Sequence, residues 1–241
     1  MNGQSPLDGR RAVVTGGTRG IGRAIAERLM KDGASVLVTG TRDGGSGPEG
    51  SAYHAVDFAN ASATGRFAEM LAKEAPDILV NNAGINKIAP FAEIDPADFE
   101  RVQLVNLHAP MRLCRAVIPG MRRTGQGRIV NICSIWSKVS RAQRGAYSAS
   151  KFALDGLTVA LAAEVAVDGI LVNAVSPGFI DTELTRGVLG ERGIAKLVKQ
   201  VPIGRLGQPE EIAALVAWLA GPENTYISGQ NILIDGGFTR V

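Results

Sequence analysis

The sequence predicts an α/β protein, with a Rossmann-type, doubly wound parallel sheet of about seven strands and helices on both faces. Short runs rich in Val, Ile and Leu alternate with longer segments in which apolar residues recur at helical spacing. This strand–helix–strand pattern repeats along the chain, and no linker, repeat or low-complexity segment divides it. We therefore expect a single dinucleotide-binding domain over residues 1–241.

The first elements form a βαβ unit followed by an unusual connection. RAVVTGG reads as a strand, residues 21–33 as a helix that ends at Gly33, and SVLVTG as the second strand. Only TRDGGSGPEG separates this strand from the next, SAYHAVD, although a parallel crossover ordinarily needs a dozen or more residues. Four glycines and a proline exclude a stable helix in this segment. We predict that a short loop replaces the crossover helix between strands 2 and 3.

The remaining elements continue the alternation to the end of the chain. Strands are predicted at DILVNNAG, GRIVNICS, ILVNAVSPG and QNILIDGG. Helices are predicted over residues 61–74, 96–121, 147–167 and 209–220, and an amphipathic helical segment over 183–201. Strands alternating with helices indicate a parallel sheet covered on both sides.

Composition and charge exclude several classes of function. The chain is 45% apolar and 20% charged, and its 30 glycines fit a buried core with many tight turns. A net charge of +3, spread along the sequence, gives no basic patch for nucleic acid. The first residues show no signal peptide, and the longest apolar run, 212–220, is too short to span a bilayer. Cys114 and Cys133 give no disulfide framework or metal-ligand spacing, so we expect buried thiols, no metal and a cytoplasmic protein.

The first βα junction, TGGTRGIG at residues 15–22, is a candidate phosphate-binding turn. Gly16, Gly20 and Gly22 permit a tight turn and a close approach of the backbone to a ligand. The helix that follows offers unpaired N–H groups and the positive end of its dipole. Such turns also occur simply to pack a helix against a strand, but the place of this one in a βαβ unit favours nucleotide binding.

Tyr147 and Lys151 lie four residues apart in GAYSASKFAL, a segment of helical character. Positions i and i+4 share one face of a helix, so the ammonium can lie beside the phenol. A positive charge beside a phenol favours the phenolate, which suits a group that must exchange its proton at neutral pH. Because pairs with this spacing also occur by chance, the neighbouring motifs decide the interpretation.

Those motifs follow one another in a characteristic order. They are TGGTRGIG, NNAG at 81–84, Asn106, Ser134, YSASK at 147–151, SPG at 176–178 and a terminal DGG. From about residue 7 to the end, this order and spacing resembles the short-chain dehydrogenase/reductase family. The segments PGFIDTELTR and QVPIGRLGQPEEIA are most similar to bacterial 3-oxoacyl-[acyl-carrier-protein] reductases and their relatives. The resemblance implies hydride transfer between a nicotinamide cofactor and a ketone or secondary alcohol.

The resemblance also implies four catalytic roles. Tyr147 would be the acid/base, and Lys151 would tune it and bind ribose. Ser134 would orient the carbonyl, and Asn106 would hold a water for proton relay. Hydride delivery builds negative charge on the ketone oxygen, which needs both a proton and a donor to hold it.

The cofactor site that the resemblance implies is spread over the chain. It comprises Gly16, Thr18, Arg19, Gly20, Ile21, Gly22, Thr41, Arg42, Asp57, Phe58, Asn82, Ala83, Gly84, Tyr147, Lys151, Pro177, Gly178, Ile180 and Thr182. Within this set, Asp57 and Phe58 are assigned to the adenine, residues 82–84 to the far ribose, and Ile180 and Thr182 to the carboxamide.

The cofactor is predicted to be NADP(H) in preference to NAD(H). NAD-preferring folds carry an acidic residue at the end of the second strand to hold the ribose hydroxyls. Here that position is Gly40 or Thr41, and no carboxylate occupies it. Arg42 follows, and Arg19 lies in the glycine turn, so two guanidinium groups are placed to bind a phosphate dianion. Asp43 can offset part of the Arg42 charge.

Two interpretations from other classes can be compared with this one. AVSPG at 174–178 superficially resembles a hydrolase nucleophile elbow, but Ala174 replaces its first glycine. The only two histidines, His54 and His108, fall in a strand and a helix, which argues against a serine triad. A catalytically silent NADP-binding protein is the second alternative, and the intact set of four catalytic residues argues against it.

The substrate is the part of the function that the sequence determines least. In this family, residues 183–201 correspond to a mobile lid that sets substrate choice. The loop IWSKVSRAQRG places Trp136, Arg141 and Arg144 near the cleft, and we take these three as candidate substrate residues. A basic loop suits an anionic substrate, and a merely solvated loop is the alternative.

An acidic carrier protein is a weakened candidate for a partner. Arg122 and Arg123 end one predicted helix, but Glu164 and Asp168 occupy a region in which carrier-protein reductases present basic residues. A small ketone, a hydroxy acid or a sugar-derived substrate is therefore the alternative to a 3-oxoacyl thioester. The resemblance implies a homotetramer or dimer built on the two longest predicted helices.

Overall fold

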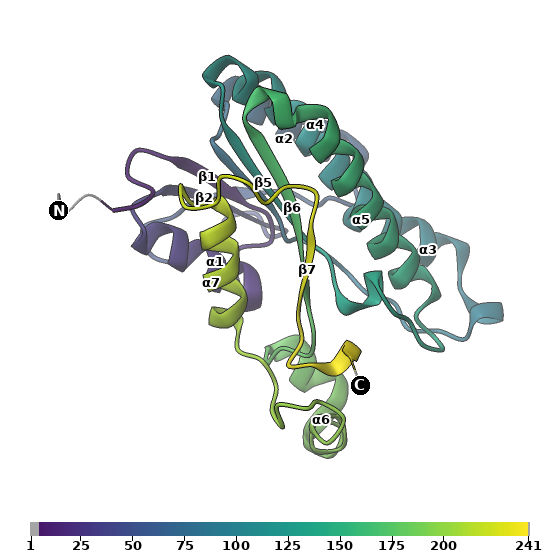
Figure 1. Cartoon of the computed structure of the whole chain (residues 1–241). Helices are drawn as coiled ribbons and strands as arrows, with labels where there is room; N and C mark the ends of the chain where they lie inside the picture. Colours follow the sequence, from purple (N-terminus) through teal and green to yellow (C-terminus); the bar gives the residue numbers. More distant parts are fainter. Residues whose placement is uncertain (1–4, 241) are drawn as a thin grey trace.

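The computed structural model describes residues 5–240, except for the side chains of Leu184 and Val188. Seven parallel strands form one twisted sheet in the order β3-β2-β1-β4-β5-β6-β7, which confirms the predicted fold class (Figure 1). The strands are β1 (Arg11–Val14), β2 (Ser35–Gly40), β3 (Ala52–Ala55), β4 (Ile78–Asn81), β5 (Gly127–Ile132), β6 (Ile170–Pro177) and β7 (Asn231–Ile234). The strand order reverses between β1 and β4, where folds of this kind bind their ligands.

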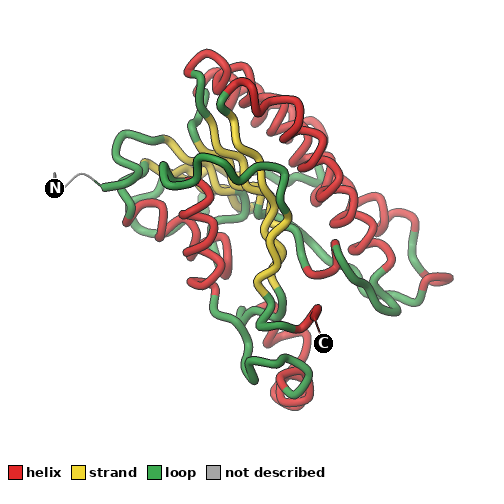
Figure 2. Tube along the Cα trace, in the orientation of Figure 1, coloured by secondary structure: helices red, strands yellow, loops and turns green. Residues whose placement is uncertain are grey.

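Helices cover both faces of the sheet, as Figures 1 and 2 show. On one face, α1 (Gly20–Lys31) packs against α7 (Pro209–Ala220). The other face is covered by α2 (Ala61–Glu74), α4 (Ala109–Thr124) and α5 (Gly145–Val165). Within the described residues, no helix is both long enough and apolar enough to cross a membrane.

The predicted helix over 96–121 is a composite of three helical segments. α3 (Pro96–Gln103) and α4 are joined by a π-helical turn, η2 (Leu104–His108). In this turn the N–H of Ala109 bonds to the carbonyl of Leu104, five residues back. π-turns of this kind frequently occur at functional sites, and Asn106 lies within this one.

The predicted helical segment over 183–201 corresponds to α6 (Glu183–Val198), which is kinked and ends at Val198. This helix contains Gly190 with φ 60° and ψ 174°, so it consists of two helical pieces joined at a kink. Glycine adopts this conformation readily because it has no Cβ. The apolar periodicity of the segment continues across Gly190, so it does not reveal the kink.

The prediction of a loop in place of the second crossover helix is confirmed. No helix occurs between β2 and β3, and residues 41–51 form turns. Tyr53 Oη donates a hydrogen bond of 2.6 Å to the carbonyl oxygen of Arg42 and so holds the loop against β3. Short 3-10 turns complete the fold: η1 (Phe91–Glu93), η3 (Ile135–Ser137), η4 (Ala166–Asp168) and η5 (Phe238–Arg240).

The core lies in two layers, one on each side of the sheet. The layer under α1 and α7 includes Ile25 and Val216, and the layer under α2, α4 and α5 includes Phe67 and Leu113. Full burial of each such side chain stabilises the fold by about 1.5–3 kcal/mol. Cys114 belongs to the second layer, where burial raises the pKa of its thiol to about 12, in agreement with its predicted role as an inert core residue.

A chain of buried polar side chains fixes α5 on the sheet. Asn81 Nδ2 donates to Asn131 Oδ1 at 2.8 Å, and Asn131 Nδ2 donates to Thr158 Oγ1 at 2.9 Å. The chain therefore links β4 and β5 to the middle of α5. Because such buried networks are costly to rearrange, they set the position of the helix that carries Tyr147 and Lys151.

Candidate active site

Tyr147 and Lys151 lie on the first turns of α5, as the i, i+4 spacing predicts. Lys151 is 3% exposed, and its Nζ donates a hydrogen bond of 2.7 Å to the carbonyl oxygen of Ile132. The same Nζ lies 5.7 Å from the centroid of the Tyr147 ring. No ion pair within residues 5–240 neutralises Lys151. Its charge is therefore held in a buried position beside the phenol ring.

Ser134 is brought to the same place by β5. It follows the last strand residue, Ile132, by two positions and acts as the N-cap of η3. Its Oγ accepts a hydrogen bond of 3.2 Å from the N–H of Trp136, which orients the hydroxyl, and the residue is 7% exposed. Cys133 lies beside it, but burial raises the pKa of that thiol to about 12, so it is not a nucleophile at neutral pH.

Asn106 is fully buried in the π-turn, and its side chain holds the site together. Its Oδ1 accepts a bond of 2.9 Å from the N–H of Ile85, and its Nδ2 donates to the Ile85 carbonyl at 2.9 Å and to Ser150 Oγ at 3.0 Å. Both amide hydrogens are therefore engaged. A relay water, the role predicted for Asn106, can be held only by the second lone pair of Oδ1 or by the backbone carbonyl.

The glycine turn lies directly above β1, where the strand order reverses. Asn82 Nδ2 donates to the carbonyls of Thr15 at 2.9 Å and Gly16 at 3.2 Å. Thr15 Oγ1 in turn accepts 2.9 Å bonds from the N–H groups of Asn82 and Ala83. A Cβ at Gly22 would collide with the Gly16 carbonyl and with Asn82 Nδ2. The Asn82 side chain thus supports the backbone of the turn.

The residues around this turn fit a dinucleotide phosphate. α1 begins at Gly20 behind the N-cap residue Arg19, which makes no side-chain cap, and no acidic residue stands in its first turn. The first N–H groups are therefore left for a ligand, and nothing there repels an anion. Arg19 and Arg42 are exposed, and neither forms an ion pair with any residue in the described part of the chain. Thr18 and Thr41 directly precede the two arginines in their loops.

The segment predicted to hold the adenine, residues 57–58, and the segment predicted to hold the far ribose, residues 82–84, differ in their contacts. Asp57 Oδ1 accepts a 2.9 Å bond from the N–H of Ala59. Phe58 packs edge-on against Phe67 with centroids 6.0 Å apart and is 6% exposed, so its side chain belongs to the core. A Cβ placed at Gly84 would lie 3.7 Å from Lys151 Nζ, so this segment borders the lysine of the candidate site.

The segment after β6 lies between α6 and the glycine turn. Gly178 donates its N–H to the Ile234 carbonyl at 3.0 Å, and a Cβ at this position would lie 2.7 Å from Asp235 Cα. Thr182 Oγ1 accepts from the N–H of Thr185 at 3.2 Å and caps α6. The Thr182 methyl carbon would lie 3.5 Å from a Cβ at Gly20, so the lid begins beside the phosphate turn. Pro177, Ile21 and Ile180 complete the predicted set.

A cavity of about 150 Å³ lies between the segment after β6, residues 201–212 and the end of β7. Phe179, Ile180 and Ile203 are among the residues that line it, whereas Ser134, Tyr147 and Lys151 are not. It is therefore separate from the cluster of Ser134, Tyr147 and Lys151.

The three candidate substrate residues cluster on one aromatic ring. Trp136 is 7% exposed, and the guanidinium carbons of Arg141 and Arg144 lie 5.4 Å and 5.9 Å from its ring centroid. Phe179 and Phe238 pack edge-on against the same indole, with centroids 6.2 Å and 6.4 Å away. Phe179 and Phe238 directly follow the SPG and DGG motifs, but sequence reasoning did not select either phenylalanine.

Ser150 is a further residue that sequence reasoning did not select. Its Oγ accepts from Asn106 and donates to the Tyr147 carbonyl at 2.7 Å, so it links the π-turn to the catalytic helix. In the sequence, the only signal for Ser150 was its place inside the YSASK motif. In the structure it is a small polar residue at a fully buried helix position, and such a residue needs hydrogen-bond partners.

The sheet, the glycine turn at its switch point and the serine, tyrosine and lysine beside it define a dinucleotide-binding oxidoreductase. The family model described as enoyl-(acyl carrier protein) reductase matches residues 16–239. The chain belongs to the short-chain dehydrogenase/reductase family.

Curated relatives and solved structures agree with this assignment. The 3-oxoacyl-[acyl-carrier-protein] reductase of Vibrio cholerae is 39% identical over 98% of this chain and 99% of its own length. The corresponding enzyme of Aquifex aeolicus is 39% identical, covering 96% of this chain and 98% of its own. A gluconate 5-dehydrogenase from Burkholderia cenocepacia, in complex with NADP and tartrate, superposes with a TM-score of 0.89 at 33% identity, covering 99% and 98% of the two chains. A ligand-free aldohexose dehydrogenase from Thermoplasma acidophilum gives 0.91 at 32% identity, covering 98% and 96%.

Proposed function

We propose that this protein is an NADP(H)-dependent carbonyl reductase that interconverts a ketone and a secondary alcohol. The observation that carries the proposal is the placement of Lys151 Nζ, 5.7 Å from the Tyr147 ring and bonded to the strand that leads to Ser134. A tyrosine, a lysine and a serine arranged in this way can hold a carbonyl and supply its proton.

Bound NADPH would supply the hydride, and the residues of the chain would do the rest. Ser134 Oγ, held by the Trp136 N–H, donates a hydrogen bond to the substrate carbonyl and orients it. Tyr147 gives its proton to the oxygen as negative charge develops there. The Lys151 ammonium stabilises the phenolate left on Tyr147 until a proton returns from solvent.

Three observations support NADP(H) over NAD(H). No carboxylate stands at Gly40 or Thr41 to repel a 2′-phosphate. Arg19 and Arg42 are exposed and without ion-pair partners among residues 5–240, so both guanidinium groups are available to a dianion. The gluconate 5-dehydrogenase with the same fold was solved with NADP bound.

Two substrate classes follow from the relatives, and one structural observation separates them. The curated relatives act on 3-oxoacyl thioesters carried by a protein, whereas one structural neighbour is a gluconate dehydrogenase. In this chain Arg122 forms a 2.7 Å ion pair with Asp168 and lies 3.9 Å from Glu164. Arg122, a basic residue that an acidic carrier protein would contact, is thus already paired with an acidic residue of the same chain. This pairing favours a small ketone or hydroxy acid.

We propose further that the chain forms a homotetramer or dimer through α4 and α5. Met111, Phe152 and Val159 on these helices are 39%, 46% and 51% exposed. Covering them in a subunit interface would remove apolar surface from water. Sedimentation equilibrium of the wild type beside a Phe152→Glu, Val159→Glu double variant tests this; a wild-type monomer would refute it.

The function is tested by NADPH oxidation with an acetoacetyl thioester, a panel of neutral ketones and a panel of oxo acids. Turnover with at least one class is expected, and Tyr147→Phe should lower it by about 10²–10⁴-fold while NADPH still binds. A protein that binds NADPH yet reduces no member of the panels, or a Tyr147→Phe variant with wild-type turnover, would refute the proposal.

A further inference from the structure

Two cations lie on one aromatic ring beside the catalytic residues without an acidic partner. The guanidinium carbons of Arg141 and Arg144 are 5.4 Å and 5.9 Å from the Trp136 centroid. Over residues 5–240, no carboxylate lies within ion-pair distance of either group. The third cation of the loop differs, because Lys138 Nζ is 2.8 Å from Asp155 Oδ2. The excess positive charge is therefore confined to the two arginines.

Arg144 is the buried member of the pair. It is 8% exposed, and within the described chain its guanidinium donates no hydrogen bond to any acceptor. Burial first, and the charge of Arg141 second, lower the pKa of Arg144. Its guanidinium nitrogens are not fully enclosed, so solvent or a ligand can reach them, and the face of Trp136 supplies only part of the stabilisation that the charge loses on burial. No carboxylate and no hydrogen-bond acceptor of the described chain pairs with this guanidinium. This indicates that an anionic ligand supplies the missing partner.

The position of Arg144 relates it directly to the reacting carbonyl. Arg144 is the N-cap of α5, and Tyr147 lies three residues further on, in the first turn. The N-cap residue and the third residue of a helix lie on the same first turn. Trp136, on which the guanidinium lies, follows Ser134 by two residues and donates its N–H to the serine hydroxyl. The cation thus borders both groups that hold the carbonyl.

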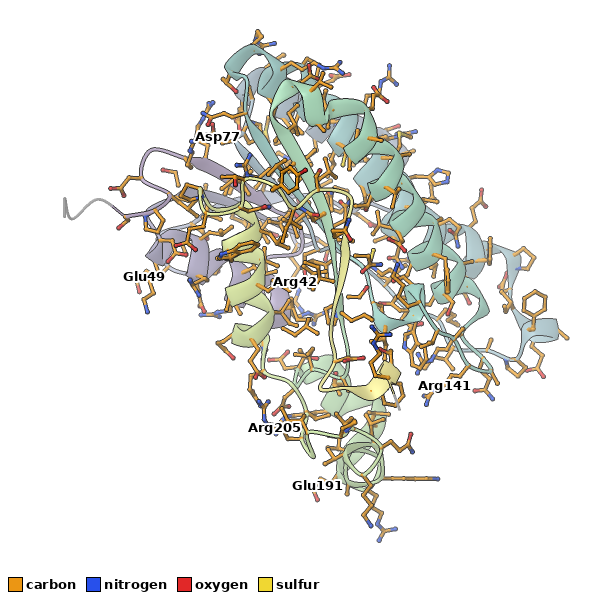
Figure 3. All side chains as sticks on the ribbon, in the orientation of Figure 1. Arg42, Glu49, Asp77, Arg141, Glu191 and Arg205 are labelled. Carbon is orange, nitrogen blue, oxygen red and sulfur yellow. The ribbon has the colours of Figure 1, made fainter. Side chains whose placement is uncertain are left out.

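Three aromatic rings fix the surface on which the guanidinium groups lie. Trp136, Phe179 and Phe238 are mutually edge-on, with centroids 5.0–6.4 Å apart. They come from the loop after β5, the segment after β6 and η5, so the tertiary fold holds the indole from two sides. Figure 3 shows Arg141 at the end of the molecule where Arg205 and the lid lie.

We propose that Arg144, assisted by Arg141, binds the carboxylate of the substrate, and that the substrate is a small oxo acid or hydroxy acid. This inference rests on the proposed function, because it assigns the part of the substrate that does not react. A guanidinium can hold a carboxylate through two parallel N–H···O bonds, which fixes the distance from the anion to the carbonyl.

The geometry favours a carboxylate over the phosphate of a carrier-linked thioester. Arg144 lies one helical turn from Tyr147, so its anion must lie a few bonds from the reacting carbon. The phosphate of a pantetheine arm lies far from the ketone, near the surface of the protein that carries it. A short oxo acid meets both requirements in one small molecule.

The kinetic test compares a series of short oxo acids with their methyl esters, which keep the ketone and lose the charge. The wild type should prefer the acids, and Arg144→Gln should lower kcat/KM for the best acid by about 10- to 100-fold. For the matching ester the loss should be less than about threefold, since a neutral group makes no charge-assisted bond. Arg144→Lys should be intermediate, because it keeps the charge and loses the paired donors. Arg66→Gln, on the exposed side of α2, is the charge-matched control and should leave both substrates unchanged.

Equal losses for acid and ester in Arg144→Gln, or a wild type that prefers the esters, would overturn the proposal. A binding measurement separates this failure from failure of the proposed function. Malonate, a small unreactive dicarboxylate, should raise the melting temperature of the NADP⁺-loaded wild type and of Arg66→Gln but not of Arg144→Gln. If no ketone is reduced and this pattern is still found, the anion site stands and the reaction is wrong. If malonate stabilises Arg144→Gln as it does the wild type, the anion site is wrong whatever the reaction.

Discussion

Asn106 Nδ2 donates a 3.0 Å hydrogen bond to Ser150 Oγ, deep in the interface between the π-turn and the catalytic helix. Both residues are fully buried. Ser150 passes the connection on to the Tyr147 carbonyl at 2.7 Å, and Asn106 also holds both backbone groups of Ile85. A single amide thus connects the loop after β4 to the helix that carries the acid/base.

Asn106→Ala is therefore expected to lower both stability and turnover. The variant loses three hydrogen bonds and leaves the N–H and C=O of Ile85 without partners, a loss of roughly 2–3 kcal/mol. For a chain of this size, that corresponds to a fall in melting temperature of about 5–10 °C. Ser150→Ala, which removes a single acceptor for Asn106, should cost clearly less. A melting temperature of Asn106→Ala equal to that of Ser150→Ala would contradict this account.

Arg19 and Arg42 are expected to set the cofactor preference. Replacing either by Ala should raise the Kd for NADPH about tenfold, since each loss removes a charge-assisted contact to the 2′-phosphate. The Kd for NADH should stay the same, because NADH lacks that phosphate. Titration of NADPH and NADH fluorescence measures both constants. Arg23→Ala is the control, because Arg23 is paired with Glu27 at 2.8 Å on the same helix. Equal NADPH and NADH affinity in the wild type would refute the assignment.

Gly22→Ala is expected to disrupt the phosphate-binding turn. The added methyl would occupy the space of the Gly16 carbonyl and of Asn82 Nδ2, and overpacking of this kind costs about 1–3 kcal/mol. NADPH binding should weaken strongly as the turn shifts, which equilibrium titration would show. Gly65→Ala in α2 is the matched control, since a Cβ there meets nothing within 4 Å and alanine favours the helix. Unchanged NADPH affinity in Gly22→Ala would count against this site.

Glu211 gives a prediction for pH dependence. Hydrogen bonds from Arg205 and from the Gln208 N–H lower the pKa of Glu211 from 4.5 to about 2. A depressed carboxyl pKa stabilises the fold above pH 4.5, and this contribution is lost as the pH falls toward 2. Glu211→Gln should therefore melt slightly below the wild type at neutral pH, by a few degrees at most because the pair is partly exposed.

The melting difference between Glu211→Gln and the wild type should shrink as the pH falls from 4.5 to 2. Glu210→Gln, which alters the neighbouring carboxylate, serves as the control and should show no such trend. A difference that stayed constant across this range would show that Glu211 acts by packing and not by its charge.

Most of the fold could be predicted because local patterns determine it. The alternation of strands and helices along the chain, and the glycine-rich loop at 41–51, are readable without tertiary information and are confirmed. The kink at Gly190 was missed because apolar periodicity continues across it, and a glycine in a helix is compatible with either conformation. The π-turn at 104–108 was missed for the same reason, because the apolar periodicity of residues 96–121 does not reveal it.

The sequence by itself determined the family of this protein and the identity of its catalytic candidates, because motif order and spacing survive as a one-dimensional pattern. The roles of Asn106 and Asn82 as supports for neighbouring backbone depended on contacts with segments about 20 and 67 residues away. The cluster that unites Trp136, Phe179 and Phe238 is equally non-local. Which arginine is buried, and which cation of the loop already has a partner, likewise became visible only in the folded chain. Burial and charge pairing arise when distant segments meet, and no local pattern of residues encodes them.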